Sequence, residues 1–287
     1  MRIVNIFGGL GNQMFQYALI KILEEKFHET VLADTHLFHD YSRHNGLEIE
    51  HIFSIQLQLA SKKEIKKLAF YTSSYKVHKV LKWLHIKKPT TITEVLSKPY
   101  HQDVFRKKDT YYDGYWQDPK YYKEIRTQLT DCFQFKLPLD SKNKKTLYSI
   151  NSCPSVGIHI RRGDYLKKSR YRGVCDEEYY IKAIHLIQQK MEYPHFYFFS
   201  NDIAWCKDNL TSIIEGNDYT FVDWNKGPNS YVDMQLMSEC RALIIANSSF
   251  SWWAAYLNKV AETIIAPKKW FNATPPLQIQ LKDWILI

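Results

Sequence analysis

The stretch Gly157-Ile158-His159-Ile160-Arg161-Arg162-Gly163-Asp164-Tyr165 decides how this sequence folds. Apolar and polar residues alternate in its first half, which predicts a strand with His159 and Arg161 on one face and isoleucines on the other. The strand ends in two arginines, which are costly to bury without an anion and whose guanidinium forks match phosphate oxygens. We expect one arginine to bind a phosphate and the other to form an internal ion pair, for example Arg162 with Asp164.

Beyond this strand, short apolar segments alternate with helical patterns, which is typical of a parallel sheet covered on both faces. The predicted strands span residues 156–160, 196–200, 220–222, 242–246 and 263–266. The predicted helices span residues 177–191, 203–210, 231–240 and 251–259.

Four of these strands in succession end in polar residues. The arginine loop follows the first, and Ser200-Asn201-Asp202, Asp223 and Asn247-Ser248-Ser249 follow the next three. Ligands of open parallel sheets bind just beyond the carboxyl ends of the strands. The four strand ends therefore predict one binding crevice.

The segment from Asn247 to Trp253 closes a strand and opens a helix. Free backbone N–H groups and the hydroxyls of Ser248, Ser249 and Ser251 converge there, and such a helix start favours an anion. Capping of the helix by Ser249 or Ser251 is the structural alternative, and it is compatible with phosphate binding.

A strand–helix–strand unit opens the chain, with strands at 2–7 and 30–34 and a helix at about 12–27. Gly9 and Gly11 between them, with Asp34 after the second strand, mimic a dinucleotide fingerprint, although Met14 stands where the third glycine belongs. The alternative is that Gly9, Gly11, Asn12 and Gln13 approach a ligand.

Residues 48–100 read as helical, and nine lysines between Lys62 and Lys88 are interleaved with apolar residues. A solvated helical face is the first interpretation of this pattern, and a patch that binds a membrane surface is the second. A strand at 111–116 follows, and Asp118-Pro119 opens a helix. Candidates for stacking on an acceptor sugar are Tyr112, Tyr115 and Trp116, with core packing as the favoured alternative.

A length of 287 residues suits two domains. The polar stretch 140–153 is the linker candidate, so we expect domains at 1–148 and 149–287. The last segment is a candidate for packing back on the first domain.

The net charge of +9 favours an anionic partner such as a nucleotide phosphate, a nucleic acid or a membrane surface. No apolar run is long enough to cross a bilayer, and a strand from Arg2 leaves no room for a signal peptide, so we expect a cytoplasmic protein, with the inner membrane face as an alternative location.

Five scattered cysteines argue against disulfides and zinc. The absence of a D-x-D pair predicts that no metal or other cofactor is needed, and no P-loop motif is present.

Taken together, the motifs resemble the bacterial α-1,2-fucosyltransferases of glycosyltransferase family eleven. Residues 40–105 are the least recognisable part. The matching segments are GGLGNQMFQYA at 8–18, GYWQD at 114–118, HIRRGDY at 159–165, FSND at 199–202 and MSECRALIIANSSFSWWAAYLN at 237–258.

The resemblance implies a B-type glycosyltransferase fold, an α/β architecture of two Rossmann-like domains facing across a cleft. It implies an inverting, metal-independent transfer of L-fucose from GDP-fucose to the 2-hydroxyl of a galactoside. The implied donor contacts are Arg161 at the diphosphate, Arg162 and Asp164 shaping the loop, His159 near the guanosine, Asp202 or Asp223 at the guanine edge, and Asn247, Ser248, Ser249 and Ser251 at the phosphates. Gly9, Gly11, Asn12 and Gln13 would approach from the acceptor domain.

The expected mechanism is an in-line displacement in which Arg161 and the helix start at Ser248 stabilise the leaving diphosphate. Asp164 and His159 are both candidates for the general base, with proton transfer to water or phosphate as the alternative. A nicotinamide-dependent oxidoreductase and a nucleic-acid binder rank far below the transferase. The acceptor stays open among an O-antigen, a capsule and a free oligosaccharide, as does the oligomeric state.

Overall fold

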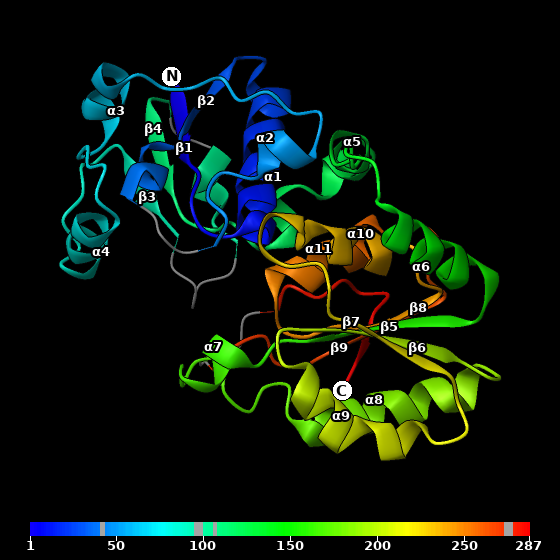
Figure 1. Ribbon diagram of the computed structural model, residues 1–287. Helices are drawn as coiled ribbons and strands as arrows, with labels where there is room; N and C mark the ends of the chain where they lie inside the picture. Colours follow the sequence, from blue (N-terminus) through cyan, green and yellow to red (C-terminus); the bar gives the residue numbers. More distant parts are fainter. Residues whose placement is uncertain (41–43, 95–99, 106–107, 273–277) are drawn as a thin grey trace. The chain divides into compact units, whose positions relative to one another are not determined.

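The computed structural model describes residues 1–40, 44–94, 100–105, 108–272 and 278–287. It divides into two compact units, Met1–Leu137 and Pro138–Ile287. Each unit is built on its own parallel sheet with helices packed against it (Figure 1). The division lies before the expected position 148, because the polar stretch 140–153 is not a linker. It forms helix α6 (Ser141–Ser152), whose first turn is capped by the carboxylate of Asp140.

The first unit contains a four-stranded sheet, several α-helices and short 3₁₀ helices, which are labelled η. Its elements are β1 (Arg2–Asn5), α1 (Leu10–Phe27), β2 (Val31–Asp34), η1 (His36–Asp40), α2 (Ile49–Ile52), α3 (Lys62–Leu68), α4 (Tyr75–Trp83), β3 (Thr91–Thr93), η2 (Gln102–Phe105), β4 (Thr110–Asp113), η3 (Pro119–Tyr121), η4 (Lys123–Ile125) and α5 (Arg126–Cys132). The strand order is β2-β1-β4-β3, and every pairing is parallel.

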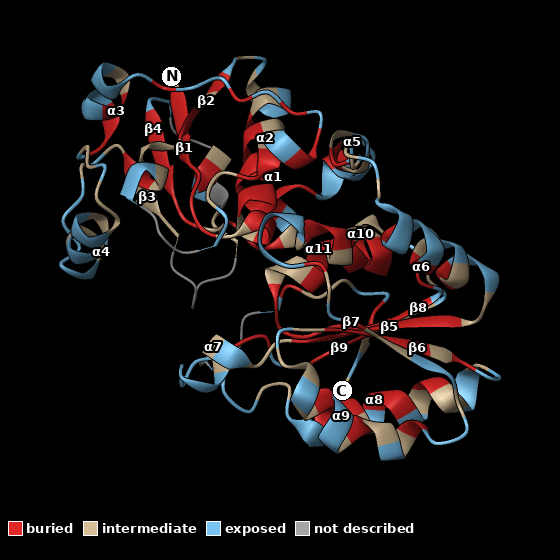
Figure 2. Ribbon diagram, in the orientation of Figure 1, coloured by how far each residue is buried: buried red, intermediate tan, exposed pale blue. Residues whose placement is uncertain are grey.

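The predicted strand–helix–strand opening is confirmed, because β1 and β2 pair in parallel with α1 between them in the chain. Helix α1 is buried along most of its length, whereas α4 buries none of its residues (Figure 2). At Pro119 the structure forms the 3₁₀ turn η3 instead of the expected helix, although Asp118 caps it as predicted and accepts from the N–H of Lys120.

The second unit contains a six-stranded sheet in the order β10-β9-β8-β5-β6-β7, again with parallel pairings throughout. Its elements are α6, β5 (Ser155–Ile160), α7 (Gly163–Leu166), α8 (Glu177–Lys190), β6 (His195–Ser200), α9 (Ile203–Leu210), η5 (Thr211–Ile214), β7 (Tyr219–Val222), η6 (Gly227–Asn229), α10 (Tyr231–Met237), β8 (Ala242–Ile244), α11 (Ser249–Leu257), β9 (Thr263–Ala266) and β10 (Ile285–Leu286).

All five strands predicted for this unit are present, and β10 was not predicted. The last segment places β10 beside β9 at the edge of the second sheet, and its packing on the first unit stays a prediction. Helix α11 begins two residues before the predicted residue 251, because Ser248 caps it at Ser249.

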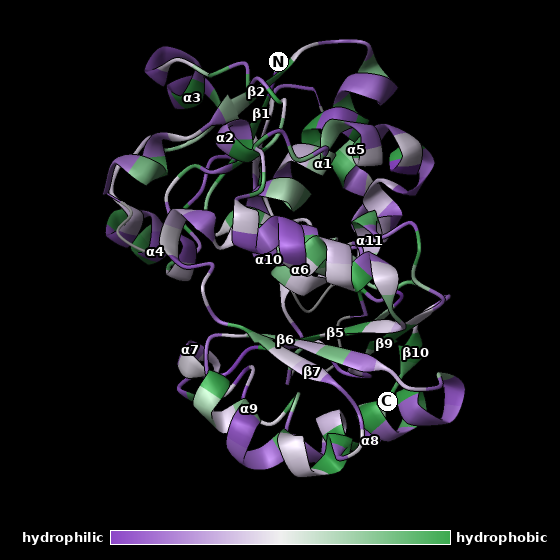
Figure 3. Ribbon diagram, turned by 45° about the vertical axis from the view of Figure 1, so that its right-hand side comes forward, coloured by the Kyte–Doolittle hydropathy of each residue, from purple (hydrophilic) through white to green (hydrophobic). Residues whose placement is uncertain are grey.

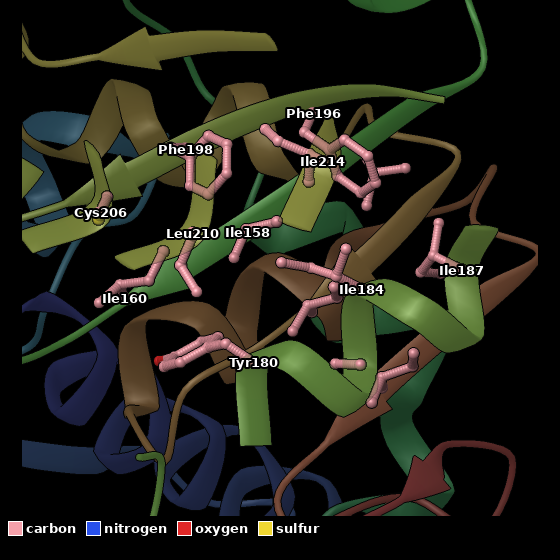
Figure 4. Close-up of a cluster of buried hydrophobic side chains, with 14 of the residues drawn as sticks. Ile158, Ile160, Tyr180, Ile184, Ile187, Phe196, Phe198, Cys206, Leu210 and Ile214 are labelled. Carbon is pink, nitrogen blue, oxygen red and sulfur yellow. The ribbon is translucent and has the colours of Figure 1, made fainter. Parts of the chain in front are cut away.

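The core of the second unit forms between the sheet and helices α8 and α9. Helix α8 carries hydrophilic and hydrophobic residues in alternating patches (Figure 3), and its buried positions repeat with the period of a helix. Ile184 and Ile187 of α8 pack with Ile158 and Ile160 of β5 (Figure 4). This burial on both sides fixes β5, so the residues after Ile160 leave the sheet at a defined place.

Candidate functional site

The polar strand ends of the second unit gather at one edge of its sheet. Ile160 of β5 lies opposite Ser200 of β6, and Ile158 lies opposite Ile244 of β8. Since these strands and β7 are parallel, their carboxyl ends meet at the same edge. The structure therefore confirms that the four polar segments predicted to form one site come together.

The two arginines after β5 each have a carboxylate partner, but not in the arrangement we expected. Arg161 pairs with Asp164, with Nη2 2.9 Å and Nε 3.1 Å from Oδ1. Arg162 does not pair with Asp164: its Nε lies 3.4 Å from Oδ2 of Asp202, and its guanidinium lies 4.0 Å from the ring centre of Trp205. The example pair Arg162–Asp164 is therefore wrong. Both guanidinium groups are partly buried and each takes a counter-charge, so which arginine binds a phosphate stays a prediction.

Asp164 is held from two sides. Its Oδ2 accepts from Nζ of Lys168 at 2.9 Å while Oδ1 accepts from Arg161. Burial acts to raise the pKa of Asp164, but the charges and hydrogen bonds of Arg161 and Lys168 outweigh it and hold this pKa below its usual range. Asp164 is therefore a weak proton acceptor that fixes the orientation of Arg161.

His159 faces the same edge but is enclosed. Its residue surface is 7% exposed, and Nδ1 has no hydrogen-bond partner among the described residues. Burial, and after it the charge of Arg161, lower the pKa of His159 to about 3. The ring is thus neutral at physiological pH, and its centroid lies 5.7 Å from that of Phe250.

Helix α11 starts beside the arginine loop. Ser248 caps it by accepting from the N–H of Phe250 at 3.3 Å, so neither Ser249 nor Ser251 is the cap. Ser251 is fully buried and donates to the carbonyl of Ala246. Asn247 is 2% exposed and donates to the carbonyl of Trp270. Of the predicted phosphate contacts, Ser251 and Asn247 thus stabilise the turn, and the half-buried Ser249 begins the helix.

Tyr165 connects the arginine loop to this helix start. Its hydroxyl donates to the carbonyl of Asn247 at 3.4 Å, and its ring centre lies 5.6 Å from the guanidinium carbon of Arg161. Arg161 and the N-terminus of α11 therefore lie at the same edge of the sheet. This combination of a guanidinium and a helix N-terminus suits a diphosphate.

The two aspartates assigned to the guanine edge differ in their surroundings. Asp202 caps α9 through the N–H of Trp205 at 3.3 Å and also pairs with Arg162. Asp223 is exposed at the end of β7. Asp223 is therefore the better placed of the two carboxylates for a contact with a guanine base.

A polar network beside Asp223 was missed by the sequence reasoning. Asn143 of α6 accepts from Nε1 of Trp224 at 2.9 Å and exchanges hydrogen bonds with Asn225 at 2.9 and 3.0 Å. Asn225 also donates to Asp233 at 2.8 Å, and burial raises the pKa of Asp233 to about 7. The only sequence signal was a tryptophan and an asparagine after Asp223, and their partner Asn143 lay in the segment interpreted as a linker.

In the first unit, the glycine motif is a scaffold. Gln13 is fully buried, and its amide donates to the carbonyls of Gly8 and Gly46 while its oxygen accepts from the N–H groups of Glu48 and Ile49. A side chain with all its hydrogen bonds inside the protein has none left for a ligand, so the expected role of Gln13 at a ligand is wrong.

Its neighbours in the motif open helix α1. Gly9 is the N-cap residue and Gly11 is buried in the first turn. Asn12 is partly exposed and accepts from Nε2 of Gln117 at 2.9 Å. Asp34 is 4% exposed and already bonded to Tyr111 and His36, so it is not the free carboxylate that a dinucleotide fingerprint requires.

Two of the three aromatic candidates for acceptor stacking lie in the core. Tyr112 and Trp116 are fully buried, and the hydroxyl of Tyr112 donates to the carbonyl of Val104. A buried ring offers no face to a sugar, so this assignment is wrong for both. Tyr115 is partly exposed, with its ring centre 4.9 Å from that of Phe7, and it stays a candidate.

Two findings bear on metals and membranes. Among the described residues, no three His, Cys, Asp or Glu side chains gather as a metal site would require, and metal independence stays a prediction. No helix in the described part of the chain is long and apolar enough to cross a bilayer.

The sequence matches a family model described as Glycosyl transferase family 11 over residues 1–287. An Escherichia coli protein named alpha-1,2-colitosyltransferase is 31% identical over 282 residues, which cover 94% of this chain and 92% of that protein. Human galactoside alpha-(1,2)-fucosyltransferase 1 is 34% identical over 105 residues, or 36% of this chain and 28% of that protein.

The fold also has solved counterparts. The fucosyltransferase NodZ from Bradyrhizobium aligns over 92% of this chain and 94% of its own with a TM-score of 0.52, at 12% identity. This likeness confirms the expected B-type glycosyltransferase architecture of two parallel-sheet units.

Proposed function

Since this chain belongs to glycosyltransferase family 11, we propose that it moves L-fucose from GDP-fucose to the 2-hydroxyl of a galactoside, with inversion at the sugar carbon. Family membership along the whole chain gives no support to the oxidoreductase alternative. One observation carries the proposal: Tyr165 joins the Arg161 loop to the start of α11 at the carboxyl edge of the second sheet.

The donor diphosphate would lie between Arg161 and the N-terminus of α11. The side chain of Arg161 is 31% exposed, so part of its guanidinium is accessible to a ligand. Helix α11 spans nine residues, and the N–H groups of its first turn point out of its start. Preorganised donors of this kind stabilise the charge that grows on a leaving diphosphate.

The reaction is a single displacement at the anomeric carbon. The acceptor oxygen forms a bond to this carbon as the bond to the diphosphate oxygen breaks, and GDP leaves with the electron pair. Neither Asp164 nor His159 has a pKa near neutrality, because one is held by two cations and the other is buried. We assign the acceptor proton to a diphosphate oxygen or water, and give Asp164 the role of positioning Arg161.

Recognition of the guanine base would fall to Asp223 and its neighbours. Asp223 extends from the end of β7 next to Trp224, which Asn143 holds through Nε1 and Lys142 covers at 3.7 Å from the ring centre. A carboxylate matches the adjacent N–H donors of a guanine edge. Asp202 would support the site indirectly, since it holds Arg162.

The name of the Escherichia coli relative favours a second donor, a nucleotide-activated colitose. We would incubate the enzyme with GDP-fucose or GDP-colitose and a panel of β-galactosides, and read the products by mass and linkage analysis. We expect a fucosylated product linked at the 2-hydroxyl of galactose. If only colitose is transferred, the donor is GDP-colitose and not GDP-fucose. A product linked at another hydroxyl would show that the acceptor position is not the 2-hydroxyl. Transfer from neither donor would reject the proposal.

Cytoplasmic location and association with a membrane stay proposals. The membrane proposal concerns the surface of helices α3 and α4, and it does not depend on which nucleotide sugar the enzyme uses.

A further inference from the structure

Exposed apolar side chains are concentrated in one region of the first unit. Of the thirteen large hydrophobic residues that are exposed in the described part of the chain, seven lie between residues 59 and 86. The most exposed of the seven is Trp83, at 77%. Such a cluster on a soluble protein marks a surface that binds a partner. The other six are Leu59, Phe70, Val77, Val80, Leu84 and Ile86.

Helix α4 is the centre of this region, and its outer face is exposed in the part of the chain that the structure describes. None of its residues is buried, although its sequence is strongly amphipathic. Its inner face is tied to the sheet through Asp113, which lies 3.3 Å from Nε2 of His78 and 3.5 Å from Nζ of Lys82. Val77, Val80 and Leu84 are spaced three and four residues apart and so form an apolar stripe on the opposite face.

Lysines are concentrated in the same part of the sequence as the stripe. Residues 62–88 hold nine lysines and a single acidic residue, Glu64, so this segment carries most of the net charge of +9. Glu64 belongs to the capping box of α3 and is bonded to Ser61. The exposed lysines are Lys62, Lys63, Lys66, Lys67, Lys76, Lys79 and Lys87.

Helix α3 and the chain after α4 are joined by hydrogen bonds, so the lysines of both helices lie in one region of the first unit. Lys88 donates to the carbonyl of Lys66, and Thr90 donates to the carbonyl of Leu68 at 2.6 Å. Both helices lie at the same end of the first unit in the two views of Figures 1 and 3. We call residues 62–88 the lysine surface.

We propose that the lysine surface docks on an anionic lipid bilayer, with Trp83, Val80 and Leu84 inserted at the headgroup level. Basic residues around an apolar helical face bind anionic membranes through both charge and buried area. Tryptophan prefers the interface between headgroups and acyl chains.

Charge argues against the other occupants of this surface. A second copy of the chain bound through the same patch would bring nine lysines against nine lysines, and like charges repel. A nucleic acid would neutralise the lysines, but it would leave Val77, Val80 and Leu84 in water, because aliphatic side chains do not stack on bases and Trp83 is the one exposed aromatic ring among the described residues of α4. A bilayer buries the apolar stripe and neutralises the lysines together.

Vesicle sedimentation with the full chain tests this proposal. One set of vesicles contains 70% phosphatidylcholine and 30% phosphatidylglycerol, and the other contains phosphatidylcholine alone. An apolar variant carries Val80→Ser, Trp83→Ser and Leu84→Ser, and a charge variant carries Lys76→Gln, Lys79→Gln and Lys87→Gln. The matched control carries Tyr148→Ser and Tyr193→Ser, which are 77% and 85% exposed in the second unit.

We expect the wild type and the control to bind the anionic vesicles, and to bind them less in high salt. Each lysine near such a surface contributes about a fivefold factor, so the charge variant should bind at least about tenfold more weakly. The apolar variant should also lose at least about tenfold, and both variants should transfer sugar to a soluble acceptor at the wild-type rate. Wild-type transfer activity in both variants would show that a loss of vesicle binding is independent of the proposed transferase function.

Several results would overturn the proposal. Equal binding of the wild type to both vesicles would remove the role of charge, and undiminished binding of the apolar variant would remove insertion. A wild-type dimer that the apolar variant dissociates would make the surface a subunit interface. Binding to single-stranded RNA that only the charge variant loses, with no vesicle binding, would assign it to nucleic acid.

Discussion

Nη2 of Arg161 lies 2.9 Å from Oδ1 of Asp164, and Nε of the same guanidinium lies 3.1 Å from that oxygen. The side chain of Arg161 is 31% exposed, so donors that face away from Asp164 are accessible to a phosphate oxygen. Lys168 binds the second oxygen of Asp164 and keeps the carboxylate charged. The arginine is thus held in place by a group that leaves part of it accessible, as preorganised stabilisation of a leaving group requires.

Replacing Arg161 with alanine should lower kcat by about 10²–10³, because a preorganised donor to the leaving diphosphate is lost. Asp164 keeps Lys168 as a partner, so the protein should stay folded. Arg161→Lys should recover little activity, since an ammonium lacks the planar fork. Steady-state kinetics with GDP-fucose and a thermal melt measure both effects.

Arg241→Ala is the matched control, because this arginine is exposed at the amino end of β8, away from the site. It should leave kcat unchanged. Turnover close to wild type in Arg161→Ala would remove this residue from the mechanism.

Replacing Asp164 with asparagine separates positioning from proton transfer. If Asp164 only orients Arg161, the variant should raise KM for the donor and lower kcat/KM by about tenfold, with the shape of the pH profile kept. Because its pKa lies below the usual range, an acid limb due to Asp164 would fall below pH 5, so kcat is the deciding quantity. Replacing a general base at this position would lower kcat by about 10²–10⁴ without raising KM for the donor. The measurement is kcat and KM for the donor between pH 5 and pH 9, and a loss of that size in kcat alone would make Asp164 the base.

The second unit was predictable because its strands are short, rich in apolar residues and bounded by polar residues. Every predicted strand appears, and the segments after 160, 200, 222 and 246 meet because parallel strands end at one edge. The partners of individual side chains could not be read in this way. Asp202 is 40 positions from Arg162 and Asn143 is 82 from Asn225, and only the folded sheet brings them together.

In the first unit, several predictions of functional residues from the sequence were wrong. The opening glycine motif looked like a ligand contact, yet Gln13 bonds to the chain near Gly46 and Glu48, far along the sequence. Tyr112 and Trp116 looked like sugar platforms, but Tyr112 lies in β4, which is buried on both faces, and Trp116 is fully buried beyond the end of that strand. A period-two pattern does not show which face of a strand is covered when helices lie on both.

Replacing His159 with glutamine should make stability less dependent on pH in the acid range. The unfolded chain binds a proton on this histidine below pH 6.5, whereas the folded chain does so only near pH 3. The neutral ring therefore contributes stability that is present above pH 6.5 and is lost as the pH falls. Between pH 6.5 and pH 5 the loss is about 2 kcal/mol.

Urea unfolding of both proteins at pH 7 and pH 5 measures this effect. The wild type should lose about 2 kcal/mol more than His159→Gln on acidification, and comparing the two proteins cancels the carboxylates they share. Equal losses would show that His159 is protonated in the folded enzyme, which would restore it as a candidate base.

Replacing Gln13 with alanine tests whether the glycine motif is a scaffold or a ligand contact. The variant leaves the carbonyls of Gly8 and Gly46 and the N–H groups of Glu48 and Ile49 without the amide that joins them. Each buried polar group left unpaired costs about 1–3 kcal/mol, so a total loss of about 3 kcal/mol is a conservative expectation. Gln134→Ala in the same unit is the matched control: Gln134 is exposed, its amide bonds only to Thr130, and its replacement should change stability by less than about 0.5 kcal/mol. Urea unfolding gives both values, and KM for donor and acceptor is measured on the folded fraction. A Gln13→Ala variant of wild-type stability with a raised KM would show that this amide reaches a substrate after all.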